Sequence, residues 1–368
     1  MVNYRLGSII GSGSYGLVFR AVEVGSETAV AVKKSRVSLR VQRTILRHES
    51  RVLQLLQGHP AIPVLYGYGQ LPHFEYLSLE LLGANAKELL VNQVRVPTVV
   101  RVVQQMLSAL SHVHKLGIVH RDIKPENVLT SLSDPSKVLL IDFGISRLIH
   151  KGVPSQYNPL EESRHVVGTL HWASLNAHDG IDLAPRDDLE SLAYAALFLL
   201  RGDLPWRSGP DSESTQRSMA RIRNSKAECT GAALATNFPP EFGELLDYSR
   251  QLKFDQIPDY SDLELRFTRL AERLGCQPED PLDWAPPDVI TPTSAPIYDE
   301  IPDADDSSGG NEDEDEDDDD DENFSNSYFE LDIGDWDIQG NRDRDLTFPG
   351  EQAQTLDSRI PQISQVEA

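Results

Sequence analysis

Two patterns of apolar residues divide the first 285 residues of this 368-residue chain. In the first eighty residues, apolar side chains form short runs or alternate with polar ones, which predicts β-strands. Farther along they recur every three or four positions, which predicts helices. The expected strands are 6–10, 17–21, 30–34 and 75–81, and the expected helices include one around Glu49, one opening at Pro97 and a buried one over 189–200. The pattern therefore predicts a strand-rich part followed by a mainly helical part.

A glycine-rich turn, G-S-G-S-Y-G at 11–16, lies between the first two expected strands. Glycines let backbone amides approach phosphate groups closely. The same G-x-G-x-x-G spacing marks dinucleotide-binding folds, but that interpretation needs a helix after the third glycine. Here Leu17-Val18-Phe19 continues as a strand, so the pattern favours a phosphate-binding hairpin.

The next expected strand places Ala31 and Lys33 on one face, because side chains alternate along a strand. Ala31 is small enough to lie under an adenine ring, and Lys33 would then point at the nucleotide while Lys34 points to solvent. A buried ammonium group needs an acidic partner. Glu49 is the sole acidic residue between Glu27 and Glu75, and helical geometry places it in the middle of an apolar face. We therefore expect Lys33 to pair with Glu49.

Two further motifs supply the chemistry of phosphoryl transfer. The segment 120–127 reads H-R-D-I-K-P-E-N, and a short apolar run ends in D-F-G at 142–144. Asp122 would accept the proton of a substrate hydroxyl, and Lys124 would lie beside the transferred group. Asn127 and Asp142 offer the hard oxygen ligands that Mg²⁺ prefers. Either motif alone could be a solvated loop or a capped turn, but together with the glycine turn they indicate a protein kinase using ATP and Mg²⁺.

Composition limits the remaining classes. Two cysteines do not suggest a disulfide scaffold, and no apolar run approaches the length of a membrane span. The start of the chain lacks a signal-peptide pattern. We expect a monomeric protein of the cytoplasm or nucleus that contacts neither membranes nor nucleic acid.

The acidity of the chain is concentrated at its end. The net charge is -24, and residues 291–368 alone hold 25 acidic residues and 3 arginines. Residues 312–322 are eleven consecutive carboxylates, whose mutual repulsion opposes a packed core. We predict a disordered acidic tail over 286–368, able to bind basic partners.

The chain resembles the casein kinase 1 family of Ser/Thr protein kinases over roughly residues 3–285. The resemblance goes beyond general kinase motifs, and it rests on these segments: G-T-L-H-W-A-S-L-N at 168–176, R-D-D-L-E-S-L at 186–192, L-P-W at 204–206, E-L-L-G at 80–83 and F-D-Q-I-P-D-Y at 254–260. It implies an α+β, two-lobed protein-kinase fold, with a small N-lobe of antiparallel sheet plus one helix over about 1–82. A larger, mainly helical C-lobe would follow over about 83–285.

The resemblance also implies roles for individual residues. Asp122 would be the catalytic base, helped by Lys124 and Thr169, and Asp188 would brace its loop. Lys33 and Glu49 would orient the nucleotide, while Asn127 and Asp142 would bind Mg²⁺. The expected ATP-binding residues are Ile10, Gly11, Gly13, Gly16, Val18, Ala31, Lys33, Glu80 and Leu82. Protein substrates are expected to supply the acceptor hydroxyl.

Two departures from the family bear on substrate choice. The family typically has an arginine where His171 stands and a lysine near Ser218, and these help to bind anionic groups upstream of the target residue. Both basic groups are missing here. A preference for acidic or phosphorylated substrates therefore stays open.

Two alternatives to an active kinase also stay open. One is a nucleotide-binding scaffold without transfer activity, and the other treats the tail as the working part. The tail could also fold back on a basic face formed by Arg40, Arg43, Arg47 and Arg51, with Ser325 as an autophosphorylation site.

Overall fold

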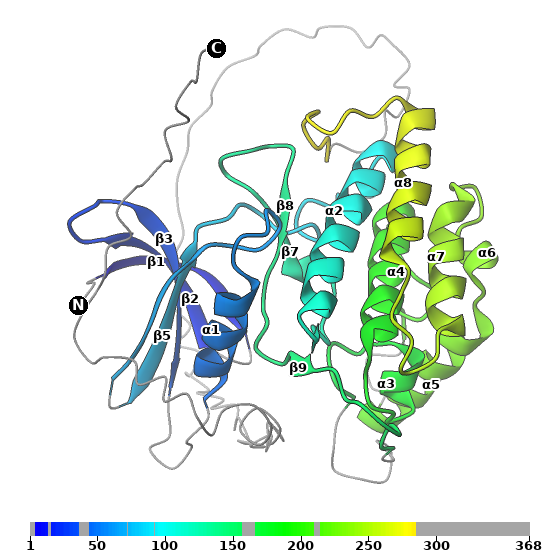
Figure 1. Cartoon of the computed structure of the whole chain (residues 1–368), viewed down its shortest axis with the longest axis horizontal. Helices are drawn as coiled ribbons and strands as arrows, with labels where there is room; N and C mark the ends of the chain where they lie inside the picture. Colours follow the sequence, from blue (N-terminus) through cyan, green and yellow to red (C-terminus); the bar gives the residue numbers. More distant parts are fainter. Residues whose placement is uncertain are drawn as a thin grey trace, which may run out of the picture. The chain divides into compact units, whose positions relative to one another are not determined.

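The fold is described from a computed structural model (Figure 1), which covers residues 4–13, 16–36, 44–71, 73–91, 93–156, 166–209 and 214–284. The predictions made for the tail over 286–368, for Ser325, and for Arg40 and Arg43 lie outside these residues. No helix in the described part of the chain is long and apolar enough to cross a membrane.

The first eighty residues form an antiparallel sheet of five strands in the order β1-β2-β3-β5-β4. The strands are β1 Tyr4–Gly13, β2 Gly16–Glu23, β3 Ala29–Arg36, β4 Leu65–Gln70 and β5 Phe74–Glu80. Four of them lie where the alternation predicted strands, whereas β4 forms an additional edge strand. Short connections join β1 to β2 and β2 to β3, as expected for antiparallel neighbours.

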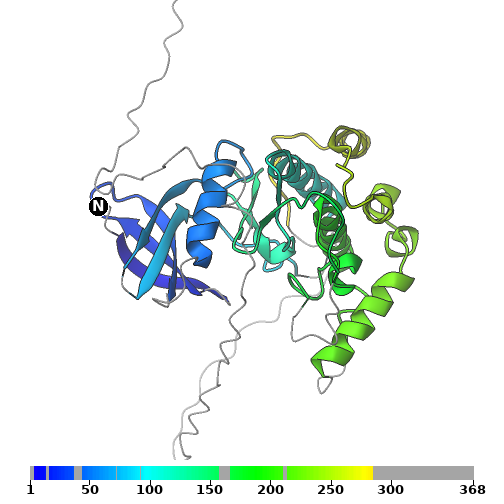
Figure 2. The same ribbon diagram turned by 60° about the horizontal axis from the view of Figure 1, so that its bottom comes forward.

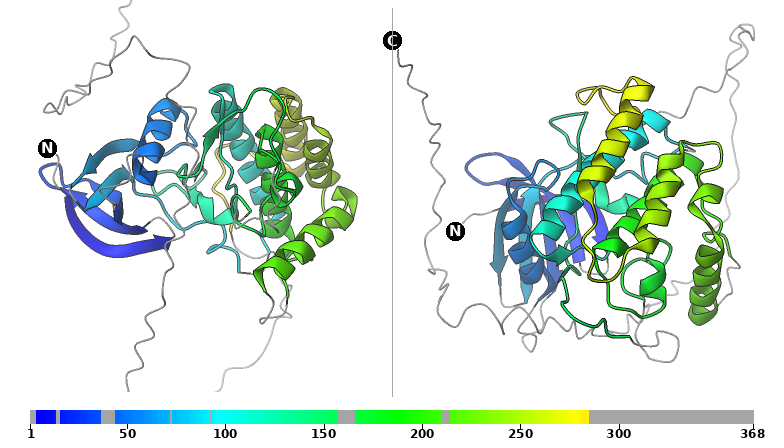
Figure 3. Two further views of the ribbon diagram at one scale, coloured as in Figure 1. Left: turned by 90° about the horizontal axis from the view of Figure 1, so that it is seen from below. Right: turned by 45° about the vertical axis from the view of Figure 1, so that its right-hand side comes forward.

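One helix, α1 (Ile45–Leu56), packs on a face of this sheet (Figures 1 and 3). Its buried face consists of Leu46, Val52, Leu53 and Leu56, together with the carboxylate of Glu49. Arg47 and Arg51 lie on its exposed side. Burying each leucine contributes roughly 1.5–3 kcal/mol, so the apolar face holds the helix on the sheet, as its periodicity predicted.

The rest of the described chain is mainly helical (Figure 2). Its helices are α2 Val96–Lys115, α3 Leu175–His178, α4 Pro185–Arg201, α5 Thr215–Glu228, α6 Gly231–Leu234, α7 Pro240–Gln251 and α8 Tyr260–Leu274. The predicted apolar helix lies within α4, which is buried along nearly its whole length and packs against α2 and α7. The predicted arrangement of an antiparallel sheet with one helix, followed by a helical part, is confirmed.

Helix α4 begins and ends where its sequence provides the appropriate groups. Pro185 stands in its first turn, and the Asp187 carboxylate accepts a hydrogen bond from the backbone N of Ala184 at 2.8 Å. Both are favourable at a helix start. At the other end Gly202 adopts a left-handed conformation with φ 82°, the usual glycine stop.

The candidate catalytic residues lie on segments that connect two pairs of short strands. Strands β6 (Ile118–Val119) and β9 (Arg147–Leu148) pair, as do β7 (Val128–Thr130) and β8 (Val138–Leu140). The 3-10 turn η1 (Pro125–Asn127) leads directly into β7. The segment 120–127 thus joins β6 to β7, and 141–144 lies between β8 and β9, so both segments connect the same two strand pairs.

Candidate active site

The strand register aligns the glycine-rich hairpin with Lys33. Gly11 pairs with Val18, Val18 pairs with Lys33, and Lys33 pairs with Leu77 on β5. Residues opposite each other in an antiparallel sheet share a face, so Val18 and Lys33 lie on the same side. Lys34 projects to the other side, where its ammonium group lies 4.2 Å from the centre of the Phe74 ring.

Lys33 lies between two carboxylates. Its Nζ is 2.9 Å from Oε2 of Glu49 and 3.0 Å from Oδ1 of Asp142. Burial disfavours the ammonium form, but the two carboxylates outweigh burial and raise the pKa of Lys33 above its usual range. The predicted contact between Lys33 and Glu49 is confirmed, and Asp142 joins it.

A second cluster surrounds Asp122. Its Oδ1 accepts hydrogen bonds from the Thr169 hydroxyl at 2.8 Å and the Thr169 backbone N at 2.9 Å. Its Oδ2 lies 2.6 Å from Nζ of Lys124, which also donates to the Thr169 hydroxyl at 2.9 Å. The three residues that the sequence assigned to catalysis in the helical part are thus in mutual contact.

Gly168 makes this contact possible. Its φ is +85°, and a Cβ atom there would lie 2.5 Å from the backbone O of Arg121. Only glycine fits both the left-handed backbone and the close approach. The glycine before Thr169 therefore lets the segment 168–174 lie directly on the catalytic loop.

Asn127 and Asp142 lie at the ends of adjacent strands. The backbone N of Ile141 donates to the backbone O of Asn127 at 3.0 Å, which brings the two segments together. The amide Nδ2 of Asn127 donates to the backbone O of Asp122 at 2.8 Å. Its amide oxygen and the Asp142 carboxylate are hard oxygen donors of the type that suits Mg²⁺.

The backbone is strained at two points of this site. Arg121 and Asp142 have φ values of 74° and 65°, in the left-handed region that ordinary side chains rarely adopt. Such conformations persist where surrounding contacts enforce them, often at functional sites.

The contacts that hold Arg121 come from a buried carboxylate. Asp188 of α4 accepts hydrogen bonds from the backbone N of His120 at 2.7 Å and of Arg121 at 2.8 Å. Its Oδ2 also lies 2.8 Å from Nε2 of His114. Burial opposes ionisation of Asp188, but these partners outweigh burial and lower its pKa. Asp188 thus braces the catalytic loop.

Sequence reasoning missed the residues behind Asp188. His114 of α2 bonds through Nδ1 to the hydroxyl of Tyr260, so the brace runs from α8 to the catalytic loop. His120 adds a second tie, with Nε2 3.0 Å from the backbone O of Ile141. The cluster of three histidines at 112–120 was the available signal.

The expected adenine-binding residues lie on strands of the sheet and on the segment that follows β5. Ala31 pairs with Leu79 across β3 and β5, in register with the Lys33 row. The backbone N of Glu80 donates to the backbone O of Val64 at 2.9 Å. Leu82 follows β5 in the segment that leads to the helical part. Ile10 is 49% exposed although apolar.

Comparison with known proteins agrees with this geometry. The protein kinase domain model matches residues 4–253. The chain belongs to the protein kinase family. Casein kinase I homolog 1 of Schizosaccharomyces pombe is 33% identical over 289 residues, which cover 77% of this chain and 64% of that protein. The predicted membership of the casein kinase 1 family is thus confirmed, and the kinase chain spans less than two thirds of its relative's length.

A buried lysine lies beneath the segment that carries Thr169. Lys226 of α5 is fully buried and donates from Nζ to the backbone O of Leu170 at 3.0 Å and of Ala173 at 2.6 Å. Nζ also lies 3.1 Å from Nε2 of His178. Burial and the neighbouring Lys226 lower the pKa of His178 to about 3, so this histidine is neutral at physiological pH.

A pH-dependent loss of stability follows from His178. Its pKa is about 3 in the folded kinase and 6.5 as the ordinary value. The unfolded state therefore takes up the proton first, and stability is lost as the pH falls from 6.5 towards 3. The titration of His178 by itself is expected to remove about 2 kcal/mol of the free energy of unfolding between pH 7 and pH 5. Urea unfolding at both pH values, compared between the native chain and a variant that lacks this imidazole, isolates the contribution.

A His178→Gln variant provides the control for that measurement. It keeps a hydrogen-bond acceptor for Lys226 but cannot titrate, so its loss between pH 7 and pH 5 should be smaller. The carboxyl of Asp187, whose pKa burial raises to about 6, acts in the opposite direction in both proteins and cancels in the comparison. Equal pH slopes would contradict the role of His178.

The structure places His171 and Ser218, the two positions at which the chain differs from the family pattern. Burial and nearby cations, Arg207 first among them, lower the pKa of His171, which favours its neutral form. Ser218 lies in the first turn of α5, where its backbone N donates to the backbone O of Ser214 at 2.9 Å, an ordinary helical hydrogen bond.

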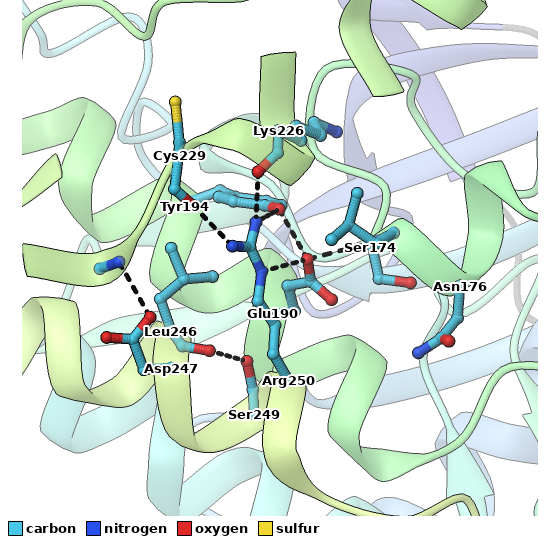
Figure 4. Close-up of polar contacts among 12 residues, drawn as sticks. Ser174, Asn176, Glu190, Tyr194, Lys226, Cys229, Leu246, Asp247, Ser249 and Arg250 are labelled. Carbon is cyan, nitrogen blue, oxygen red and sulfur yellow. Dashed lines mark hydrogen bonds and ion pairs between the residues drawn. The ribbon is translucent and has the colours of Figure 1, made fainter. Parts of the chain in front are cut away.

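A buried ion pair supports the end of the segment 168–176 (Figure 4). Arg250 of α7 lies 3.2 Å from Oε1 of Glu190 on α4, and the same oxygen accepts from the Tyr194 hydroxyl at 2.6 Å. The backbone N of Leu175 also donates to it at 3.3 Å. Glu190 of α4 thus connects α7 to the residues after Trp172.

Proposed function

We propose that the chain is an active Ser/Thr protein kinase of casein kinase 1 type, which transfers the γ-phosphate of Mg-ATP to hydroxyl groups of proteins. The proposal rests on one observation, that the residues around Asp122 and the residues around Lys33 each form a cluster of direct contacts. Asp122 is in contact with Lys124 and Thr169, and Lys33 is in contact with Glu49 and Asp142. A scaffold without activity would not need both.

The residues present fit a nucleotide with a divalent cation. Lys33 is held as an ammonium group on the face of β3 that also carries Ala31, and backbone amides of the glycine hairpin lie one strand away. Asp142 and Asn127 provide the oxygen donors. When bound, Mg-ATP supplies the transferable phosphoryl group and neutralises the charge on its phosphates.

The kinase's own residues would position the acceptor and move its proton. Asp122 would orient the hydroxyl of the substrate and accept its proton, since its carboxylate is fixed by Thr169 on one oxygen and by Lys124 on the other. Lys124, as a cation beside Asp122, would stabilise negative charge on the transferred group. Asp188 would keep the loop in place. Positioning and electrostatics then account for catalysis.

We also propose that basic proteins bind to the acidic tail, whose charge supports such association. We propose that the substrates are proteins that supply a hydroxyl group, and that the chain itself is located in the cytoplasm or the nucleus.

The test is phosphate transfer from radiolabelled Mg-ATP to casein by the purified chain. We expect labelling by the native protein and none by Asp142→Asn, which keeps the shape of the side chain but loses the charge that faces Lys33 and the metal. Nucleotide affinity is measured beside it. Absence of labelling by the native protein despite ATP binding would favour the scaffold alternative.

A further inference from the structure

Helix α1 begins without a capping group of its own, and a glutamate from the sheet takes that place. Its first turn has no acidic residue, and Thr44, the N-cap residue, makes no side-chain capping bond. A helix start leaves backbone N–H groups without partners and favours a negative charge. Oε1 of Glu75 on β5 accepts a hydrogen bond from the backbone N of Leu46 at 3.1 Å. The cap is thus supplied by another element.

The same carboxylate holds two further groups. Its Oε2 accepts a hydrogen bond from the Thr44 hydroxyl and another from the Tyr68 hydroxyl at 3.1 Å. Glu75 is only 1% exposed. A buried carboxylate is costly unless donors surround it, and once satisfied it fixes the groups that donate to it. Glu75 therefore ties the start of α1 to β5, its own strand, and to β4.

The catalytic contacts of α1 lie one turn beyond this tie. Glu49 bonds to Lys33 at 2.9 Å, and Nε2 of the adjacent His48 lies 2.8 Å from the backbone O of Ser146. Both contacts require the first turns of α1 to stay close to β3 and to the segment after Asp142. A shift at the start of α1 would move both.

The fit of α1 against that segment leaves little room. A Cβ atom on Gly144 would lie 3.1 Å from Cγ2 of Ile45, the first residue of α1, and 3.8 Å from Oε2 of Glu49. Such a separation is tight for carbon atoms. The position of the α1 start is therefore closely determined, and a displacement of about 1 Å is enough to alter catalysis.

We propose that Glu75 is a positioning residue for phosphoryl transfer, which holds the start of α1 against β4 and β5 and so keeps Glu49 in contact with Lys33. The inference rests on the proposed kinase function and adds a residue to its machinery. Glu75 acts through α1, because its carboxylate is occupied by Thr44, Leu46 and Tyr68.

Two single variants separate positioning from simple stabilisation. Thr44→Val and Tyr68→Phe each remove one donor to the same oxygen of Glu75, but only Thr44 belongs to the start of α1. We expect Thr44→Val to lower kcat clearly more than Tyr68→Phe at matched loss of thermal stability. If the loss of kcat simply follows the loss of stability in both variants, the proposal fails.

A double-mutant cycle tests the route through Glu49. Glu75→Gln, which keeps the side-chain shape, should lower kcat roughly tenfold to a hundredfold with little change in KM for ATP. In a Glu49→Gln background the same change should have little further effect, because the contact with Lys33 is already lost. Equal losses in both backgrounds would overturn the proposal, as would an unchanged kcat for Glu75→Gln.

Amide hydrogen exchange provides a readout that needs no activity. In Glu75→Gln, amides at 46–50 should exchange faster while those of α2 stay unchanged. Faster exchange together with no transfer by the native chain would mean that the kinase function fails while the brace exists. Normal transfer with unchanged exchange at 46–50 would mean that the kinase function stands and the brace does not exist.

Discussion

Asp122→Asn is expected to lower kcat by about 10²–10⁴-fold, the range for loss of a general base. Asparagine can still accept hydrogen bonds from the hydroxyl and backbone N of Thr169, which lie 2.8 and 2.9 Å from Oδ1 of Asp122. The loop therefore keeps its shape. An amide cannot take up the proton of the acceptor hydroxyl, and it no longer balances the ammonium group of Lys124, 2.6 Å away.

Steady-state phosphorylation of casein, with KM for ATP measured separately, checks this expectation. The contacts of Lys33 with Glu49 and Asp142 do not involve Asp122, so KM for ATP should change little. Asp134→Asn is the matched control, because Asp134 lies in the hairpin between β7 and β8 and pairs with Lys137. A kcat for Asp122→Asn above a tenth of the native value would exclude Asp122 as the base.

The two catalytic clusters were predictable because their residues are forced together by general rules. Alternation along β3 selected Lys33 over Lys34, and the lack of any other acid between Glu27 and Glu75 selected Glu49. The apolar face of α1 fixed the direction of that carboxylate. Asp122, Asn127 and Asp142 came from motifs whose spacing suits phosphoryl transfer. Their mutual distances then depend on the pairing of β7 with β8.

Other parts required contacts between residues far apart in the chain. The edge strand β4 contains Gly67 and Gly69, which have low strand propensity, and it is held by its pairing with β5. A side chain at position 69 would collide with Tyr76, because a Cβ on Gly69 would lie 2.2 Å from the Tyr76 ring. Periodicity describes one segment at a time, so it could not predict this strand.

The brace formed by Tyr260, His114 and Asp188 was missed for the same reason. The three residues come from α8, α2 and α4 and meet only in the folded C-lobe. The three histidines at 112–120 are visible in the sequence, but their spacing does not say which residues of α4 and α8 they contact. Glu75 was equally hidden, since its partners at 44, 46 and 68 belong to different elements.

The buried ion pair between Glu190 and Arg250 concentrates several hydrogen bonds on one guanidinium group. Arg250 donates to the Tyr194 hydroxyl at 2.8 Å, to the backbone O of Lys226 at 2.9 Å and to the backbone O of Cys229 at 2.7 Å. Glu190, at 3% side-chain exposure, accepts from it at 3.2 Å. Figure 4 shows these groups around Arg250. Removal of the arginine would leave a buried carboxylate without its cation and two carbonyls without their donor.

Arg250→Ala should therefore lower the free energy of unfolding by about 3–5 kcal/mol and the melting temperature by about 10 °C. The control is Arg266→Ala, whose arginine pairs with Asp262 and Glu244 at 42% exposure and should cost under about 1 kcal/mol. Urea and thermal unfolding measure both.

Because part of the cost comes from the carboxylate left unpaired, Arg250→Met combined with Glu190→Gln should lose less than the two single changes added together. Additive losses, or a loss for Arg250→Ala no larger than that of the control, would mean that the pair is exposed to water in solution.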